Sequence, residues 1–575
     1  MKKVFPIFGS LTNYDPGHFK GDLWAGLTVG VMLIPQGMAY AMIAGLPPIY
    51  GLYASSIPLI IYALLGTSRQ LAVGPVAMVS LLTAAGISSF AAPGSAEFIG
   101  YAITLALLVG IIQFTLGIFK LGFLVNFLSH PVISGFTSAA ALIIGFSQLK
   151  HLFGLSLSRE LAVYEIPIAI GRQFGEINWT TFALGAIGIA LILVIRKINK
   201  KIPGLLLAVI LSIVATYILK LNDQGVLIVG SVPQGLPQIW MPQIDFQTIG
   251  ILAPTALAIS LVSFMESIAV AKSIQAKHKD YKVIPNKELI ALGLSNVGGA
   301  FFQSYPVTGG FSRTAVNDDA GAKTGMASII SALLIILTLL FLTPLFYYLP
   351  NAILASVILV AVYGLIDVKE AMHLWKADRS DFWMLIITFI STLILGIEIG
   401  IGIGVFLSLA IIIYRTTRPH IAVLGKVPDT NLYRNVLRFE DIDERPDILI
   451  VRFDDQLYFA NINFFQEKIE ELIIERSQNV KTVIIASESI SFVDSSAITG
   501  LKDLVKNIHS RNMKVYFSGV IGPVRDRLYR SKLMDLIGKE NFFINVQEAV
   551  NAHEKPGPNI RDNELQQYST QSNLK

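Results

Sequence analysis

Residues 304–324 read SYPVTGGFSRTAVNDDAGAKT, a polar and glycine-rich stretch in a chain that is apolar on both sides of it. An unpaired charge at the centre of a bilayer costs about 3 kcal/mol on insertion scales, so Arg313 needs a partner or a water-filled cavity. We expect a broken membrane helix that is extended up to Val307 and helical after it, with Arg313 one or two turns inside. Alternatively, Arg313 extends to the cytoplasmic interface from a short helix.

The chain around this stretch is typical of a membrane protein. Hydrophobic residues make up 53% of its 575 residues and charged residues 15%. Apolar runs such as 26–45 and 98–119 reach the ~20 residues that span a bilayer as a helix. Up to about residue 414 we count twelve such segments, or fourteen if the glycine-rich pieces around Pro75 and Val307 are half-helices. The first spanning helix serves as its own targeting signal, and no cleaved signal peptide is predicted.

The distribution of basic residues favours fourteen crossings. With the N-terminus inside, the outer loops hold only Lys150, Arg159, Arg172 and Lys220, and the other lysines and arginines before position 419, apart from Arg313, lie inside. This asymmetry follows the positive-inside rule and predicts that both termini are cytoplasmic. The chain has no cysteine, which excludes disulfides, thiolate metal sites and cysteine nucleophiles, and its eight scattered histidines predict no metal site.

A second, soluble domain is expected after residue 418, where charges become frequent. Segments 447–453, 481–487 and 513–520 read as buried strands, and 461–476, 495–510 and 523–538 carry apolar residues at helical spacing. We therefore predict four parts: a cytoplasmic segment at 1–20, a transmembrane domain at 21–418, an α/β domain at 430–553 and a disordered tail at 554–575.

The membrane part contains an internal repeat. LIPQGMAYA, with Gln36, lies about 230 positions before SFMESIAVA, with Glu266, and VGPVAMVS around Pro75 lies a similar distance before YPVTGGFS around Val307. Two halves of seven segments fit this spacing, as in transporters built from inverted repeats. The two half-helices would then begin near the bilayer centre with free N–H groups that face each other. Two such helix N-termini make an anion site.

Arg313 would be paired in this site by Glu266 or by a bound anion. An entering anion would compete for the arginine and leave the carboxylate easier to protonate, which couples proton and anion entry. The alternative for Glu266 is a permanently paired structural carboxylate.

Several of these motifs resemble the signatures of a known family. Segments 34–55 (IPQGMAYAMIAGLPPIYGLYAS), 66–82 (GTSRQLAVGPVAMVSLL) and 305–324 are similar to signatures of the SulP sulfate permease and anion transporter family, and SFVDSSAITGL at 491–501 resembles its STAS domain. The resemblance runs from about Lys20 to Ala552. It implies a polytopic α-helical membrane protein of fourteen segments in two inverted seven-helix repeats, divided into core and gate, with a C-terminal cytoplasmic α/β STAS domain. It also implies a homodimer.

The resemblance implies the site residues as well. The substrate positions are Gln36, Tyr40, Val76, Ala77, Phe311, Ser312 and Arg313, and the coupling acid is Glu266. Lipid or core packing is an equal alternative for the two aromatic residues, and Ser312 could instead bond a helix carbonyl. In STAS domains of bacterial sigma-factor regulation a serine of the D-S-S loop is phosphorylated. By this resemblance Ser496, or less strongly Ser495, is the candidate phosphorylation site. We favour the alternative interpretation, in which Asp494 or Ser495 caps the helix that follows.

The function implied is secondary active transport of a small inorganic oxyanion, and glutamate at position 266 favours sulfate taken up by proton symport. Alternatives are sodium-coupled bicarbonate uptake, anion exchange, dicarboxylate transport, and an anion sensor that signals to cytoplasmic regulators through the STAS domain. We expect no enzyme activity, no cofactor besides the coupling ion H⁺ or Na⁺, and no nucleic acid partner. No ATP-binding G-x-x-x-x-G-K-[ST] loop is present, so an ATP-driven pump is disfavoured. The expected location is the inner or plasma membrane.

Overall fold

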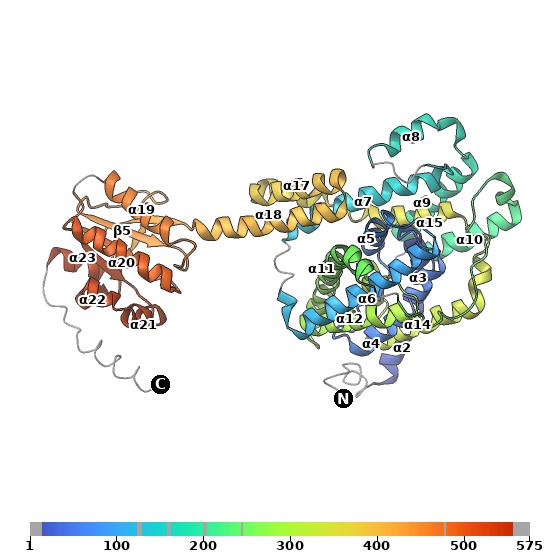
Figure 1. Ribbon diagram of the computed structural model, residues 1–575, viewed down its shortest axis with the longest axis horizontal. Helices are drawn as coiled ribbons and strands as arrows, with labels where there is room; N and C mark the ends of the chain where they lie inside the picture. Colours follow the sequence, from blue (N-terminus) through green and yellow to red (C-terminus); the bar gives the residue numbers. More distant parts are fainter. Residues whose placement is uncertain are drawn as a thin grey trace. The chain divides into compact units, whose positions relative to one another are not determined.

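The computed structural model describes residues 14–123, 129–157, 163–198, 204–242, 245–476 and 479–555. The chain divides into two compact units, Met1–Ser408 and Leu409–Lys575, and each is described by itself (Figure 1). The predicted N-terminal segment lies outside the described residues up to residue 13. The predicted tail lies outside them from residue 556, and so do Arg159 and part of the basic loop around residue 200.

The first unit is helical, because its sequence is a succession of long apolar runs. Eight stretches in the described residues are long and apolar enough to cross a membrane by length and composition. If α3 and α4 are counted as one segment and the short helices α8 and α16 are left out, the described chain has fourteen consecutive helical segments. The helices are α2 (Pro16–Ile43), α3 (Ile49–Ala54), α4 (Ile57–Leu65), α5 (Ala77–Ser88), α6 (Ala96–Ile118), α7 (His130–Phe153), α8 (Ile166–Arg172), α9 (Trp179–Ile198), α10 (Gly204–Leu219), α11 (Phe246–Lys277), α12 (Pro285–Phe301), α13 (Phe311–Asp319), α14 (Met326–Leu337), α15 (Asn351–Tyr363), α16 (Val368–Ala377), α17 (Arg379–Leu395) and α18 (Ile397–Thr417).

Helix packing in this unit is reciprocal between its two halves. Helix α2 packs against α13 and α14, and its counterpart α11 packs against α5 and α6. Likewise α7 packs against α17, and its counterpart α15 packs against α9. These reciprocal contacts are expected if a two-fold axis relates the first seven segments to the second seven in order. The repeat in the sequence predicts such an arrangement.

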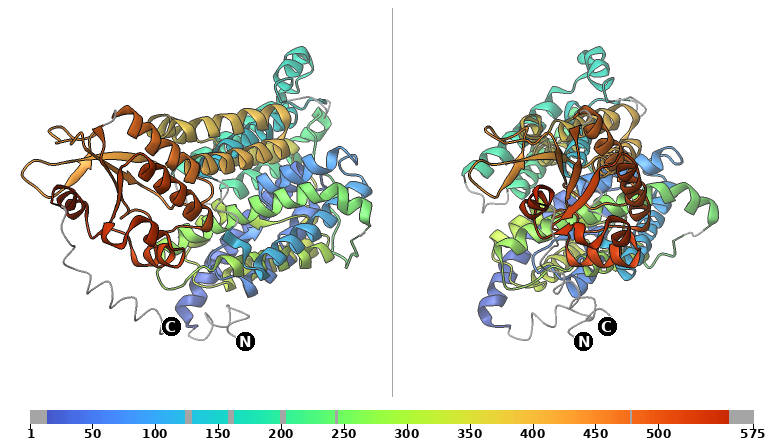
Figure 2. Two further views of the ribbon diagram at one scale, coloured as in Figure 1. Left: turned by 60° about the vertical axis from the view of Figure 1, so that its left-hand side comes forward. Right: turned by 90° about the vertical axis from the view of Figure 1, so that its left-hand side faces the viewer.

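The helices form two groups, which Figure 2 shows as separate layers of the unit. The core group consists of α2 to α6 and α11 to α14, and the α7 group consists of α7, α9, α10, α15 and α17. Glycines allow close crossings inside the core group. A Cβ on Gly51 would lie 1.9 Å from the carbonyl oxygen of Gly37, and one on Gly110 would lie 2.7 Å from that of Gly293. Small residues at such crossings let membrane helices pack backbone to backbone.

The second unit is an α/β domain around a six-stranded sheet of order β4-β3-β5-β6-β7-β8, in which β5 to β8 are parallel. The predicted strands and helices are confirmed except at 523–538, where Lys532 adopts a left-handed conformation (φ 57°) and divides the predicted helix in two. The elements are β3 (Ile421–Lys426), β4 (Tyr433–Asn435), β5 (Ile448–Phe453), α19 (Ile462–Glu475), β6 (Thr482–Ala486), α20 (Ser495–Ser510), β7 (Lys514–Ser518), α21 (Gly522–Arg530), α22 (Leu533–Ile537), β8 (Phe542–Phe543) and α23 (Val546–Glu554).

Candidate functional site

Two broken helices meet inside the core group. Strand β1 (Val73–Gly74) pairs antiparallel with β2 (Thr308–Gly309), with Val73 opposite Gly309. Two residues separate the end of β1 from the start of α5 at Ala77, and one residue separates the end of β2 from the start of α13 at Phe311. The predicted change from extended chain to helix is therefore confirmed, although the second helix starts later than expected because Thr308 and Gly309 form the strand.

Both helices begin without a side-chain cap. Neither N-cap residue, Val76 or Gly310, accepts a hydrogen bond with its side chain from the first turn that follows. The N–H groups of a first helical turn have no partner within their own helix, and they carry the positive end of the helix dipole. The sequence places no Ser, Thr, Asp or Asn at these two positions, so the N–H groups are left for another acceptor.

Arg313 connects the two half-helices. Its side chain is 1% exposed, and Nη1 donates to the carbonyl oxygen of Pro75 at 2.6 Å and to Oε1 of Gln36 at 3.3 Å. Among the described residues Nε and Nη2 have no hydrogen-bond partner. Arg313 lies in the first turn of α13, which is closer to the start of the helix than predicted. Two charged donors are thus buried beside two uncapped helix N-termini.

The predicted pairing of Arg313 with Glu266 is not a direct contact in the structure. Glu266 lies on α11 within electrostatic range of Arg313, but no ion pair joins the two side chains, and within the described structure Glu266 Oε2 is buried without a hydrogen-bond partner. The direct partners of Arg313 are Pro75 and Gln36, because its guanidinium extends toward the segment that precedes α5.

The half-buried Glu266 differs in this respect from two fully buried carboxylates of the unit, Glu288 and Asp22. Glu288 accepts hydrogen bonds from the Tyr62 hydroxyl at 2.6 Å and from the Thr67 backbone N–H at 2.6 Å. Asp22 accepts from the Lys323 N–H at 2.6 Å and from the Thr324 hydroxyl at 2.6 Å. Those two carboxylates have structural partners, as buried polar groups ordinarily do. The free oxygen of Glu266 is the exception that calls for a ligand or a proton.

The other predicted substrate residues surround Arg313 to different degrees. Gln36 donates to the Tyr40 hydroxyl at 3.0 Å, so these two residues and Arg313 form one hydrogen-bonded chain. Val76 and Ala77 are 8% and 5% exposed. Phe311 is 62% exposed and Ser312 is also exposed. The predicted set therefore divides into a buried part around Arg313 and an open part at the start of α13.

Sequence reasoning missed one hydroxyl pair at this site. Tyr305 and Ser80 are fully buried, and their hydroxyl oxygens lie 3.1 Å apart. The pair joins α5 to the extended segment before β2, and Tyr305 lies within electrostatic range of Arg313. The signal was present in the motif YPVTGGFS, where tyrosine directly precedes proline.

A buried amide also holds the extended segment in place. Asn296 on α12 accepts from the Val307 N–H at 2.8 Å and donates to the Val307 carbonyl at 3.1 Å, so it pairs with this residue as a neighbouring strand would. It also donates to Oε1 of Gln113 on α6 at 3.1 Å. The backbone polar groups of an irregular segment inside a membrane need such partners.

Ser267 links the helix that carries Glu266 to the same segment. Its hydroxyl accepts from the Gly309 N–H at 2.8 Å and lies 2.6 Å from the hydroxyl of Thr308. Because Ser267 directly follows Glu266, β2 and the carboxylate-bearing turn of α11 are held in a fixed relation.

In the second unit Asp494 is the N-cap residue of α20. Its carboxylate accepts from the Ala497 N–H at 2.8 Å and from the Phe459 N–H at 3.0 Å. This confirms capping by Asp494, whereas Ser495 lies inside the helix. Ser495 and Ser496 are exposed in the first turn, and their phosphorylation stays a prediction.

Comparison with known proteins gives matches over most of the chain. The model of the sulfate permease family matches residues 19–388, and that of the STAS domain matches 441–549. "Sulfate transporter 4.1, chloroplastic" of Arabidopsis thaliana is 40% identical over 563 residues, covering 95% of this chain and 82% of that protein. "High affinity sulfate transporter 2" of Stylosanthes hamata is 35% identical over 571 residues, covering 96% and 86%.

Solved structures are also similar. The murine Solute Carrier 26 family member A9 anion transporter in the inward-facing state gives a TM-score of 0.88 at 26% identity, covering 96% of this chain and 94% of that one. The transmembrane domain of a cyanobacterial bicarbonate transporter, BicA, gives 0.59 at 21% identity, covering 69% and 98%. The second likeness concerns the fold alone.

Proposed function

The chain belongs to the sulfate permease family, and from this premise we propose that it carries sulfate across a membrane as a secondary active transporter. The observation that carries the proposal is the pair of uncapped helix N-termini beside Arg313, whose Nε and Nη2 have no partner among the described residues. Helix N-termini and a planar guanidinium suit a small oxyanion. The relatives named sulfate transporters point to sulfate among such anions. No covalent chemistry is part of the proposal.

Glu266 is proposed as the site of proton coupling. When sulfate binds, its charge competes with the carboxylate for the positive potential of Arg313, so a proton on Glu266 becomes more favourable. The free Oε2 of Glu266 has room for that proton because no described donor occupies it. A proton and sulfate would then move together.

Uptake into liposomes by the purified protein tests the proposal. Labelled sulfate is expected to accumulate when the outside is acidified, and parallel assays with bicarbonate and fumarate under proton or sodium gradients separate the alternatives. Glu266→Gln is expected to abolish proton-driven accumulation and to keep sulfate counterflow. Glu97→Gln, on the exposed first turn of α6, is the control for loss of a carboxylate. Full uphill uptake by Glu266→Gln would sink the coupling role.

Several further features belong to the same proposal. The excess of basic residues in alternate loops supports cytoplasmic termini, in an inner or plasma membrane. The parts 1–20, 21–418, 430–553 and 554–575 are proposed as the functional divisions of the chain. We assign the gate to the α7 group and propose that it forms a homodimer, and that regulators contact the STAS domain. Because the chain lacks cysteine, single-cysteine cross-linking on α17 tests the dimer without interfering thiols.

A further inference from the structure

The short helix α16 lies between two membrane segments, α15 and α17. Residues 364–367 separate it from α15, and Asp378 alone separates it from α17. Glu370 of α16 lies beside His130, the first residue of α7, with Oε1 and Nδ1 3.2 Å apart. In the fourteen-segment arrangement α15 ends and α17 and α7 begin on the same side of the membrane. Helix α16 therefore lies at that membrane surface, which is the cytoplasmic one by the proposed orientation.

One face of α16 exposes apolar side chains. Val368, Met372 and Trp375 are 61%, 57% and 48% exposed, and their spacing of i, i+4, i+7 places them on one face of the helix. We call these three residues the α16 stripe. Leu374, which is 8% exposed, packs on the unit from another face. A helix at a membrane surface that turns a row of large apolar side chains away from its own protein is suited to lie in the lipid interface.

Two lysines lie along one edge of the α16 stripe. Lys369 directly follows Val368 and Lys376 directly follows Trp375, so both lie roughly 80–90° around the helix from the middle of the stripe. Both are exposed, and within the described residues neither makes an ion pair or a side-chain hydrogen bond. Lysines in this position extend along apolar surface and bring their ammonium groups to the level of the lipid headgroups.

The carboxylates near the α16 stripe have their own partners. Asp367 caps α16 by accepting a hydrogen bond from the Glu370 N–H at 2.9 Å, and Asp378 caps the first turn of α17 in the same way. The Glu370 side chain faces His130. Asp381 lies in the first turn of α17, where the helix dipole favours a carboxylate. The two lysines are thus left for a negative group from outside the described chain.

Trp375 is held in place by α17. Its ring packs edge-on against Phe382 with the ring centroids 4.8 Å apart, and the guanidinium carbon of Arg379 lies 5.5 Å from its centroid. Phe382 also contacts Trp383, which is 54% exposed, with the ring centroids 5.6 Å apart. Tryptophans concentrate at the boundary between lipid chains and headgroups. The two exposed tryptophans therefore indicate that the α16 stripe lies at this boundary.

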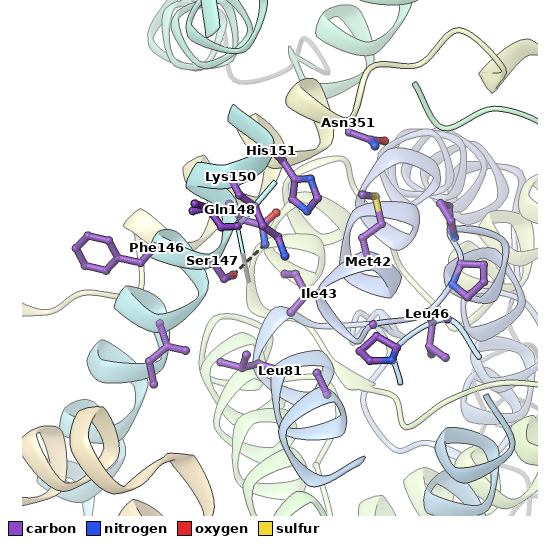
Figure 3. A pocket seen from close by; sticks show the side chains of 18 of the residues that line it. Met42, Ile43, Leu46, Leu81, Phe146, Ser147, Gln148, Lys150, His151 and Asn351 are labelled. Atoms are coloured by element: carbon purple, nitrogen blue, oxygen red, sulfur yellow. Dashed lines mark hydrogen bonds between the residues drawn. The ribbon is translucent and has the colours of Figure 1, made fainter. Parts of the chain in front are cut away.

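The first repeat has a short helix at the corresponding place, and it lacks this pattern. Helix α8 connects α7 to α9 as α16 connects α15 to α17. Its Ile166 lines a cavity of about 540 Å³, around which Figure 3 shows Met42 and Gln148, and α8 contains no lysine. The positive-inside rule accounts for lysines in an inner loop. It does not account for an exposed apolar stripe beside them.

We propose that α16 is a binding site for an anionic phospholipid, whose acyl chains cover the α16 stripe and whose headgroup phosphate is bound by Lys369 and Lys376. A second copy of the chain is a less suitable occupant, because a two-fold contact through the stripe would bring the same lysines of both copies together. An anionic membrane surface attracts a protein by about fivefold in affinity for each lysine close to it. The source of the lipid in the cytoplasmic leaflet rests on the proposed orientation.

A fluorophore on α16 measures which lipids surround it. Because the chain has no cysteine, Met372→Cys provides one thiol in the stripe for labelling with bimane. The full-length protein is reconstituted in phosphatidylcholine with a minor fraction of phosphatidylglycerol, and either the phosphatidylglycerol or an equal amount of the phosphatidylcholine carries brominated chains. Bromine quenches only fluorophores that it contacts, so the ratio of the two quenching values gives the local preference for the anionic lipid. We expect a preference of roughly 25-fold from the two lysines.

Charge variants identify the source of this preference. In the Met372→Cys background, Lys369→Gln and Lys376→Gln are each expected to lower it about fivefold, and the double variant is expected to abolish it. The sulfate-free Tm should stay unchanged, because neither lysine has a partner in the described structure. Lys279→Gln with Lys282→Gln is the matched control, since both are exposed lysines between α11 and α12, on the inner side by the same orientation. This control should keep the full preference.

The outcomes separate the lipid site from its alternatives. Equal quenching by the two brominated lipids would show lipid contact without headgroup selection and overturn the site. A preference that persists in the double lysine variant would refute the role of Lys369 and Lys376. Blue-shifted emission that neither brominated lipid quenches would show that protein, such as a second copy, covers the stripe. The assay contains no sulfate, so a protein that selects the anionic lipid but takes up no sulfate would refute the proposed function alone.

Discussion

Replacing Arg313 by glutamine tests whether this arginine binds the anion or only holds the structure together. The side chain makes two hydrogen bonds through Nη1 and leaves Nε and Nη2 without partners in the described structure. Hydrogen bonds to a charged group contribute ~1.5–3 kcal/mol each, and a buried donor without a partner costs ~1–3 kcal/mol. The two effects nearly cancel in the sulfate-free protein. We therefore expect Arg313→Gln to keep the sulfate-free Tm within about 3 °C of the parent value.

Binding should change much more than stability. Two donors that bond sulfate at the lower value of ~1.5 kcal/mol each contribute about 3 kcal/mol, which corresponds to roughly a hundredfold in affinity. At a sulfate concentration one hundred times its Kd the parent protein gains about 2.7 kcal/mol of stability. With the Kd a hundredfold weaker, the variant gains only about 0.4 kcal/mol at the same concentration. The rise in Tm on adding sulfate should therefore almost disappear.

The assay is thermal unfolding of the purified protein, followed by tryptophan fluorescence with sulfate or with chloride at equal ionic strength. Arg313→Lys keeps the charge without the planar fork, so its sulfate response should be intermediate. Arg379→Gln removes an exposed arginine from α17 and is the matched control. A full sulfate response in Arg313→Gln would refute the binding role. A fall of more than 10 °C in the sulfate-free Tm would show that Arg313 acts mainly in the fold.

Three further predictions concern other residues. Asn296→Ala strands the N–H and the carbonyl of Val307 and is expected to lower stability by about 1–3 kcal/mol and to reduce sulfate uptake; the control Ser295→Ala, which loses only a bond within its own helix, should do neither. Asp494→Ala should cost the second unit about 1 kcal/mol, whereas Ser496→Ala should leave its Tm unchanged. Burial raises the pKa of Glu488, so its ionised form opposes folding above the folded-state pKa; Glu488→Gln should raise the Tm at pH 7.5 and have no effect below about pH 4, where both states are protonated.

The sequence was sufficient to predict the structure wherever a local pattern of residues determines it. The change from extended chain to helix at Pro75 and after Val307 follows from glycine, proline and the apolar residues beside them, and Asp494 precedes α20 as a capping residue should. The strands of the second unit follow from short buried apolar runs. The division of 523–538 could not be read in this way, because the left-handed conformation of Lys532 interrupts an otherwise continuous helical pattern.

The partners inside the site depend on residues far apart in the chain. The repeat in the sequence places Glu266 and Arg313 near each other, and their opposite charges alone predict an ion pair. The sequence does not show in which direction the guanidinium of Arg313 points. In the structure the guanidinium reaches the Pro75 carbonyl, 238 positions earlier in the sequence. Asn296 pairs with a backbone rather than with a side chain. Helical periodicity does not reveal either contact, because each depends on which faces of two helices meet.

The hydrogen bonds of the site also bear on how a carrier of this fold can move. Among the described residues, those bonds join β1, β2, α2, α5, α6, α11, α12 and α13, which all belong to the core group. The α7 group meets the core group through helix packing instead, of α7 on α5 and of α10 and α15 on α2. A displacement of one group against the other would break apolar contacts, which are nondirectional and can form again after sliding. It would keep Arg313, Glu266 and both helix N-termini in one unit. Alternating exposure by relative motion of the two groups therefore costs no hydrogen bond of the site, whereas separating α5 from α13 would break the β1–β2 pairing and the bond from Arg313 to Pro75.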